Sequence, residues 1–135
     1  MDLEDAQRAI EGARVKADEI GIPMCIAVVD NNAYLKAFVR VGDTTLDSIQ
    51  LAIDKAYTAA LIRMDTEELG RLSQPGKELY GIQNNLGGRL VIFPGGVPVW
   101  RDGKLIGAVG ASGGLVEQDH ACALAGVSAI GKPNQ

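Results

Sequence analysis

The chain has 135 residues, a length that is sufficient for one domain with a buried core but too short for two. Its formal net charge at pH 7 is -4. Hydrophobic residues make up 47% and charged residues 22% of it, and this ordinary globular mixture excludes a disordered chain. The sequence has no cluster of lysine or arginine residues, which excludes nucleic acid as a partner. No apolar run approaches the roughly 18 residues that are needed to span a bilayer, which excludes a membrane protein.

A helix is predicted at the start of the chain, within "MDLEDAQRAIEGARVKADEIG". Its apolar residues recur at intervals of three and four, Asp2 can cap its first turn, and Gly21 can end it. The apolar run "PMCIAVVD" and the segment "YLKAFVR" follow as two strands. Because the asparagines of "DNNA" between them tolerate a positive φ, these strands are predicted to form a hairpin.

A second helix is predicted in "TTLDSIQLAIDKAYTAALIRM", where apolar residues again follow a helical period and Thr44 or Thr45 can cap the first turn. The segment "DTEEL" repeats this capping pattern with Asp65 and Glu68, which predicts a short helix. The stretch "SQPGKELYGIQNNLGG" carries turn residues without periodicity and is predicted to be an irregular loop.

Three further strands are predicted in "RLVIFPGG", "VPVWRD" and "KLIGAVGASG". Asp102 and Gly103 suit the tight turn between the last two. A helix in "LVEQDHACALAGVSAI" and a frayed tail, "KPNQ", complete the single domain, residues 1–135. The fold class is therefore α+β, a five-stranded, mostly antiparallel sheet flanked by helices, with "MCIAVVD" near the middle of the sheet.

The two cysteines and the single histidine limit metal and redox chemistry. Cys25 lies in an apolar run and Cys122 in a predicted helix, so both are expected to be buried hydrophobic residues and not a disulfide pair. With His120 as the only histidine, the ligand spacing of a zinc site cannot be written. We therefore expect no metal site.

Several segments together resemble the GlcG/HbpS family of haem-binding-like domains: "AVVD", "SIQLAIDKAYTA", "LYGIQ", "RLVIFPGGVPV" and "IGAVGASGGLVEQDHACALAG". The resemblance runs from residue 3 to residue 129. It implies a profilin-like sheet and homo-oligomers from dimer to octamer. The family includes haem-binding sensors, domains fused to cobalamin adenosyltransferases, and proteins encoded with catabolic enzymes. No cofactor is certain, but haem is a candidate, with His120, Tyr34, Tyr57 or Tyr80 as the iron ligand.

Two glycine pairs flank the last two predicted strands and suggest an anion pocket. Gly113 and Gly114 precede the last helix, where free backbone N–H groups and the positive end of the helix dipole attract an anion. Gly95 and Gly96 precede the neighbouring strand, so both pairs could line one pocket. Lys55, amid alanines, could reach the same anion and act in catalysis. The alternatives are ordinary turns and a solvated lysine.

The other candidate residues lie in loops and in the last helix. Tyr80 and Arg89 fall in the irregular stretch, where ligand-binding residues are common, and Arg89 could grip a carboxylate or serve as a structural cap. Asp30 ends a buried strand and is either a catalytic base or a turn residue that accepts from backbone N–H groups. His120 either moves protons near neutral pH or is simply packed.

The leading hypothesis is a homo-oligomer that binds a small anionic molecule, either a metabolite carboxylate or a tetrapyrrole. The alternative is a cofactor-free isomerase or lyase of a catabolic pathway, in which Lys55 or Arg89 polarises a carboxylate and His120 or Asp30 shifts a proton. A purely structural assembly subunit, with no ligand, is the third hypothesis. Because the acidic start of the chain is unlike a signal peptide, we expect a cytoplasmic location.

Overall fold

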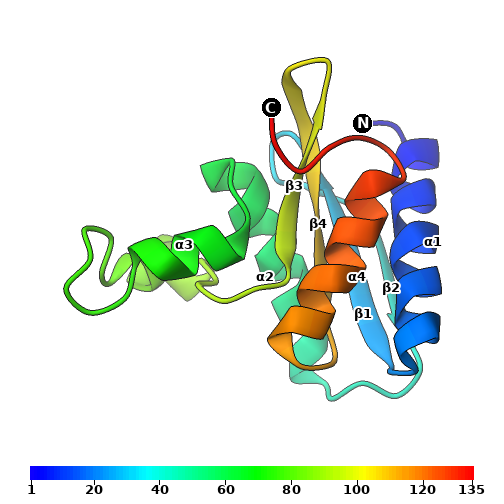
Figure 1. Ribbon diagram of the computed structural model, residues 1–135, viewed down its shortest axis with the longest axis horizontal. Helices are drawn as coiled ribbons and strands as arrows, with labels where there is room; N and C mark the ends of the chain where they lie inside the picture. Colours follow the sequence, from blue (N-terminus) through cyan, green and yellow to red (C-terminus); the bar gives the residue numbers. More distant parts are fainter.

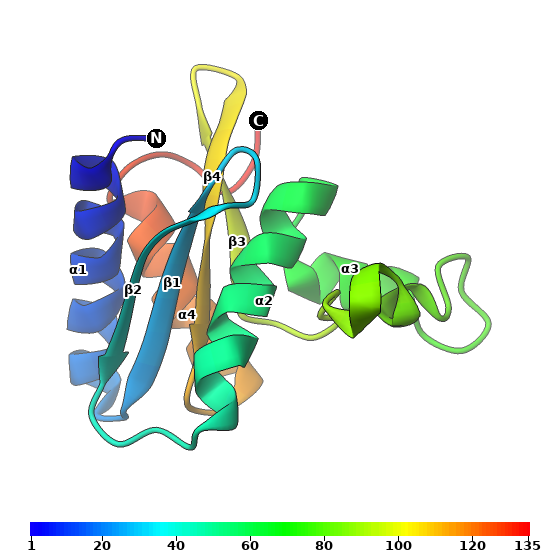
Figure 2. The same cartoon turned by 180° about the vertical axis from the view of Figure 1, so that it is seen from behind.

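The computed structural model describes residues 1–135 and has one antiparallel sheet between two layers of helix (Figure 1). α1 and α4 pack on each other and cover one face, and α2 covers the opposite face (Figure 2). The elements in chain order are α1 (Leu3–Ile20), β1 (Met24–Asp30), β2 (Leu35–Val41), α2 (Asp47–Ile62), α3 (Thr66–Leu72), the short helices η1 (Ile82–Asn84) and η2 (Leu86–Gly88), β3 (Gly96–Arg101), β4 (Lys104–Ser112) and α4 (Val116–Ser128).

β1 separates the two halves of the core. The strand order is β2-β1-β4-β3, so β2 and β3 are the outer strands, and every neighbouring pair is antiparallel. Because successive side chains of a strand point to opposite faces, Met24, Ile26 and Val28 pack beneath α1 and α4. Cys25 and Ala27 pack beneath α2 on the other face. The predicted place of this strand inside the sheet is confirmed.

The sheet has four strands, so the prediction of five is wrong, although the α+β class agrees with the structure. The missing strand is "RLVIFPGG". Leu90 and Val91 are buried, as an apolar run indicates, but the N–H of Val91 donates to the hydroxyl of Thr58 on α2 at 3.0 Å. Pro94 has no N–H to offer, and Gly95 has φ +133°. The run therefore bonds to a helix over most of its length and reaches the sheet only at its end, where the carbonyl of Gly95 accepts from the N–H of Ala111 on β4 at 2.9 Å and Gly96 begins β3.

Local signals set the ends of two helices as predicted. The Asp2 carboxylate accepts from the N–H of Asp5 at 2.8 Å at the start of α1, and Gly21 ends that helix in the left-handed region with φ 84°. Asp65 caps α3 in the same way by accepting from the N–H of Glu68 at 2.8 Å. Both cysteines are buried and unpaired, which confirms that prediction as well.

Two other end predictions are wrong. The N-cap of α2 is Leu46, without a side-chain cap, because the hydroxyl of Thr44 instead accepts from Nε of Arg40 at 3.0 Å. The tail "KPNQ" is anchored at its first residue and to that extent is not frayed, since the N–H of Trp100 donates to the carbonyl of Lys132 at 2.7 Å and the N–H of Lys132 donates back at 2.9 Å. In both segments, the local conformation therefore depends on hydrogen bonds to side chains or backbone groups elsewhere in the chain.

α3 and the loop that follows it project from the body of the molecule (Figures 1 and 2). Within this projecting part, the side chains of Tyr80 and Leu86 are 66% and 52% exposed. None of the helices is both long enough and apolar enough to cross a membrane.

Candidate functional site

An ion pair lies in the interior between α2 and α4. Lys55 on α2 has no exposed surface, and its Nζ donates to Oδ2 of Asp119 at 2.9 Å and to the carbonyl of Ala111 at 3.0 Å. The ring of Phe93 has its centroid 5.3 Å from the same nitrogen, within the range of a cation–π contact. Ion pairs removed from water need such additional partners, because desolvation offsets much of the attraction between the charges.

One glycine pair binds the carboxylate of this ion pair. The N–H groups of Gly113 and Gly114 donate to Oδ1 of Asp119 at 3.1 and 2.9 Å. These are the free N–H groups that the sequence offers to an anion. The anion that they bind here is the protein's own carboxylate, supplied from the first turns of α4.

The other glycine pair makes room for the lysine. A Cβ at Gly95 would lie 2.5 Å from Nζ of Lys55, and a Cβ at Gly96 would overlap the carbonyl of the same lysine. Both glycine pairs and Lys55 therefore converge, as the sequence suggests. The point where they meet is a buried carboxylate and not an open pocket.

The charge of Lys55 is balanced locally. Burial lowers the pKa of its ammonium, and the neighbouring Asp119 carboxylate opposes that shift. Because Asp119 accepts hydrogen bonds through both carboxylate oxygens, neither partner of the pair has an obvious vacant site for a ligand.

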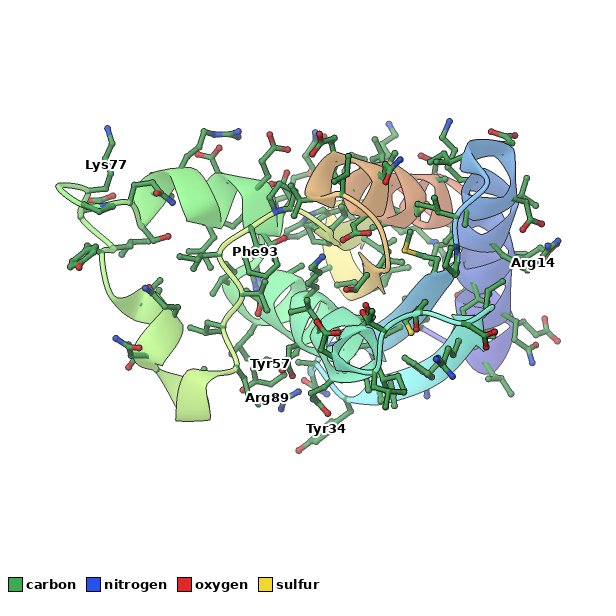
Figure 3. All side chains as sticks on the ribbon, turned by 90° about the horizontal axis from the view of Figure 1, so that it is seen from below. Arg14, Tyr34, Tyr57, Lys77, Arg89 and Phe93 are labelled. Atoms are coloured by element: carbon green, nitrogen blue, oxygen red, sulfur yellow. The ribbon has the colours of Figure 1, made fainter.

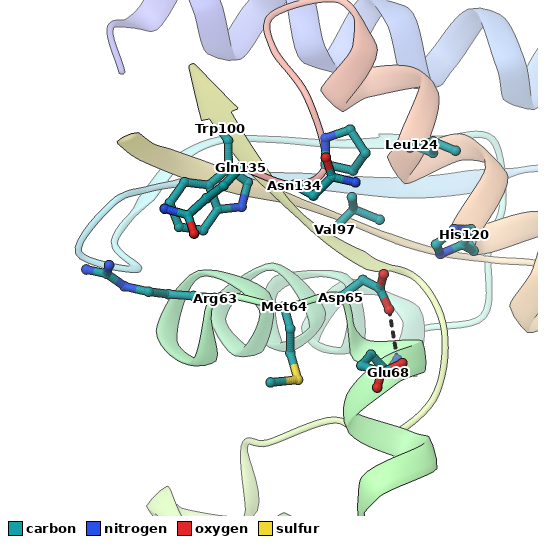
Figure 4. Close-up of a pocket in the computed structure, with 11 residues that line it drawn as sticks. Arg63, Met64, Asp65, Glu68, Val97, Trp100, His120, Leu124, Asn134 and Gln135 are labelled. Carbon is teal, nitrogen blue, oxygen red and sulfur yellow. Dashed lines mark hydrogen bonds between the residues drawn. The ribbon is translucent and has the colours of Figure 1, made fainter. Parts of the chain in front are cut away.

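An open hollow of about 450 Å³ lies next to His120, the residue that follows Asp119 on α4 (Figure 4). Its apolar wall includes Val97 and Trp100 of β3 and Leu124 of α4. The full lining comprises Arg63, Met64, Asp65, Glu68, Val97, Trp100, His120, Leu124, Pro133, Asn134 and Gln135. The hollow thus joins the end of α2, the start of α3, β3, α4 and the tail.

His120 lines this hollow and has one ring nitrogen without a hydrogen-bond partner. Its side chain is 25% exposed, and Nδ1 lies 3.9 Å from Oε2 of Glu67. Nδ1 itself is buried without a hydrogen-bond partner. An unpaired buried polar atom costs about 1–3 kcal/mol, so a ligand group that bonded to this nitrogen would gain by it.

The charged groups of the hollow differ in how they are partnered. Asp65 caps α3, and Glu68 accepts from Nε of Arg71 at 2.9 Å. The guanidinium of Arg63 takes part in no hydrogen bond or ion pair with the protein. In Figure 4, Arg63 and His120 lie at opposite ends of the lining, and the guanidinium of Arg63 points away from His120.

The remaining candidates lie outside the hollow. Nε of Arg89 donates to Oδ1 of Asp54 at 3.0 Å, and its guanidinium lies 3.7 Å from the ring centroid of Tyr57 (Figure 3). This stacked pair holds Arg89 on the surface of α2. Tyr80 is exposed on the projecting loop.

Asp30 occupies the turn between β1 and β2. Its Oδ1 accepts from the N–H of Asn32 at 2.8 Å and from the N–H of Tyr34 at 3.1 Å. The carboxylate thus organises the hairpin turn, which is the alternative that its position in the sequence left open.

Comparison with known proteins identifies the family. The family described as "Haem degrading protein HbpS-like" matches residues 1–128. The chain belongs to the HbpS-like family. The resemblance carried by "DKAYTA", "FPGG" and "GASGG" is therefore confirmed. Within this HbpS-like chain, those three segments supply Lys55, the glycines around it and the glycines that bind Asp119.

Relatives of the HbpS-like chain include a protein with a haem complex. The crystal structure of a PduOC:heme complex has a TM-score of 0.95 and 37% identity, and the match covers 100% of this chain and 99% of that chain. A 15.0 kDa protein of the dhaT-dhaS intergenic region of Citrobacter freundii is 42% identical over 87% of this chain and 83% of its own length. The corrinoid adenosyltransferase PduO of Salmonella typhimurium is 38% identical over 96% of this chain, but the match spans only 39% of that enzyme.

Of the eleven residues that line the hollow, the sequence singles out only His120 as a candidate. Trp100 is the only tryptophan in the chain, which is a signal that could have drawn attention to it. The pattern around Asp65 indicates only a helix cap, which the structure confirms. Arg63 gives no local signal, because its role depends on backbone geometry at the end of α2.

Proposed function

We propose that this HbpS-like protein binds a small, partly apolar anion in the hollow beside His120, and that a tetrapyrrole belongs to the class of ligands it takes. The observation that carries the proposal is the unpartnered Nδ1 of His120 at one end of an open hollow of about 450 Å³. The unpaired guanidinium of Arg63 at the other end favours a carboxylate. Ligand sites typically combine such an apolar wall with a few polar groups.

The residues of the hollow fit haem on this basis. Histidine is a usual axial ligand of haem iron, and His120 is the only imidazole in the chain. Trp100 and Leu124 would contact the apolar macrocycle, and Arg63 would pair with a propionate. Bound haem would supply an iron centre for ligand binding or redox chemistry. The haem complex of the PduOC relative supports this candidate.

The test is a haemin titration followed by absorption spectroscopy on the wild type, His120→Ala and Tyr34→Ala. We expect a saturable Soret shift that His120→Ala removes. Tyr34 is 73% exposed and outside the hollow, so Tyr34→Ala should bind as the wild type does. A shift that survives in His120→Ala would eliminate the imidazole as the ligand. Weak, nonsaturating changes in the wild type would leave carboxylates without an iron centre as the ligand class.

A second candidate function is a cofactor-free isomerase or lyase. The observation that favours it is the approach of Glu67 to His120, because a carboxylate near an imidazole can assist proton transfer. Such an enzyme should exchange the α-hydrogen of a bound carboxylate with deuterated solvent, which proton NMR would detect. Exchange that Glu67→Gln and His120→Ala both abolish would support catalysis, and binding without exchange would support the binding protein.

A further inference from the structure

Arg63 ends α2 in a backbone conformation that normally selects glycine. Its φ and ψ are 60° and 36°, in the left-handed region, and its N–H donates to the carbonyl of Ala59. Gly21 has the same role at the end of α1, with φ 84° and ψ 33°. Glycine adopts this conformation without strain, whereas an L-residue with a side chain does not. The chain therefore keeps a side chain at position 63 at a cost in stability.

The retained side chain has no partner within the protein. Every other arginine donates a hydrogen bond to a protein acceptor; these are Arg8, Arg14, Arg40, Arg71, Arg89 and Arg101. Arg63 instead lines the hollow together with Trp100. Strained backbone conformations cluster at ligand-binding positions, and of the four non-glycine residues with positive φ, Ala33, Arg63, Leu86 and Asp102, only Arg63 lines the hollow.

We infer that Arg63 is the carboxylate-binding residue of the hollow, and that the ligand is an elongated molecule with a carboxylate at one end and a hydrogen-bonding group at the other. This inference rests on the proposed function of the hollow. A guanidinium matches a carboxylate with two parallel hydrogen bonds. His120 stands at the opposite end (Figure 4), where its partly exposed imidazole takes the second polar group.

The wall between the two ends defines the middle of the ligand. Val97, Trp100 and Leu124 line it, and an aromatic or aliphatic body would contact Leu124 and the exposed part of the indole. The ligand class is therefore an aryl or alkyl carboxylate with a distal hydroxyl or carbonyl. An amine of the same shape would meet Arg63 with like charge, and the two carboxylates of the lining, Asp65 and Glu68, already accept hydrogen bonds within the protein, so it should bind more weakly.

Trp100 allows binding to be measured without a label, because it is the only tryptophan in the chain and lines the hollow. Three matched probes would be titrated by tryptophan fluorescence: hydroxyphenylpropionate, phenylpropionate and tyramine. The proteins are the wild type, Arg63→Gly, His120→Ala and, as a control outside the hollow, Arg89→Gln. We expect the hydroxy acid to bind best, phenylpropionate less tightly, and tyramine least tightly.

The variant Arg63→Gly separates binding from folding. It should weaken binding of both acids about tenfold or more, the typical loss of a charge-assisted hydrogen bond, while raising the thermal unfolding midpoint, because glycine relieves the strain. His120→Ala should remove the preference for the hydroxy acid over phenylpropionate, and Arg89→Gln should bind as the wild type does. This combination of weaker binding and greater stability is not expected of a residue with only a structural role.

Two results would overturn the inference: tyramine binding as tightly as the acids, or Arg63→Gly leaving the affinity for the acids unchanged. If no acid binds while haemin binds with His120 as its ligand, the inference fails and the proposed function stands. If neither the acids nor haemin binds in the hollow, both fail.

Discussion

Replacing Lys55 by methionine tests whether the buried ion pair holds the fold together. Methionine fills a similar volume but leaves the Asp119 carboxylate buried with only its two glycine N–H donors. Breaking a buried ion pair by removing one partner costs about 3–5 kcal/mol, a large part of the roughly 5–15 kcal/mol that stabilises a typical domain. We expect the thermal midpoint to fall by roughly 10–20 °C, measured by circular dichroism and by urea denaturation.

The double variant Lys55→Met/Asp119→Asn tests whether the loss of stability in Lys55→Met comes from the unpaired carboxylate of Asp119 or from altered packing at position 55. The amide oxygen of asparagine can still accept from Gly113 and Gly114, and no charge is left buried, so about 2 kcal/mol or more of the loss should be recovered. Lys16→Met, at a surface pair 3.6 Å from Glu19, is the control and should change the free energy of unfolding by less than about 1 kcal/mol. The reasoning is refuted if Lys55→Met costs no more than this control.

Two further predictions concern acid stability and the space around the lysine. The hydrogen bond from Arg101 lowers the pKa of Asp5 below its usual value of 3.8, so the stability that this carboxylate contributes is present above that pH and is lost as the pH falls below it. Arg101→Gln should therefore lose less stability than the wild type between about pH 5 and about pH 3, as urea midpoints would measure, and an equal loss would contradict the assignment. Gly95→Ala should lower the urea midpoint, because its Cβ would collide with Nζ of Lys55 and its φ is +133°. The control Gly76→Ala has a φ of +87° but open space around its Cβ, so it should lower the midpoint less. Equal effects of the two substitutions would show that the collision is unimportant.

The sequence predicts an element best where its boundary depends on neighbours along the chain. Asp2 and Gly21 set the ends of α1 through contacts within the helix. The segment "RLVIFPGG" has the composition of a strand, but its hydrogen-bond partner is Thr58 on α2, which no local pattern reveals. An apolar run of this kind predicts that its residues are buried, but it does not predict which element of the fold covers them.

The same distinction holds for the candidate site. The sequence brings Lys55 and the glycine pairs together as an anion site, but Asp119, the anion, is 64 residues away from the lysine. His120 is recognisable as the only histidine. Arg63 is not recognisable, because the sequence does not state which residue adopts a left-handed conformation.

The two outer strands of the sheet differ in how they resist unwanted pairing. At β3, the backbone of Trp100 is already bonded to Lys132, so an incoming strand would have to displace the tail there. β2 has no neighbour on its outer side, but its Lys36 and Arg40 are exposed. A foreign strand would have to strip water from two cations, which discourages templated aggregation at an open edge. The sheet can therefore remain small without a fifth strand to close it.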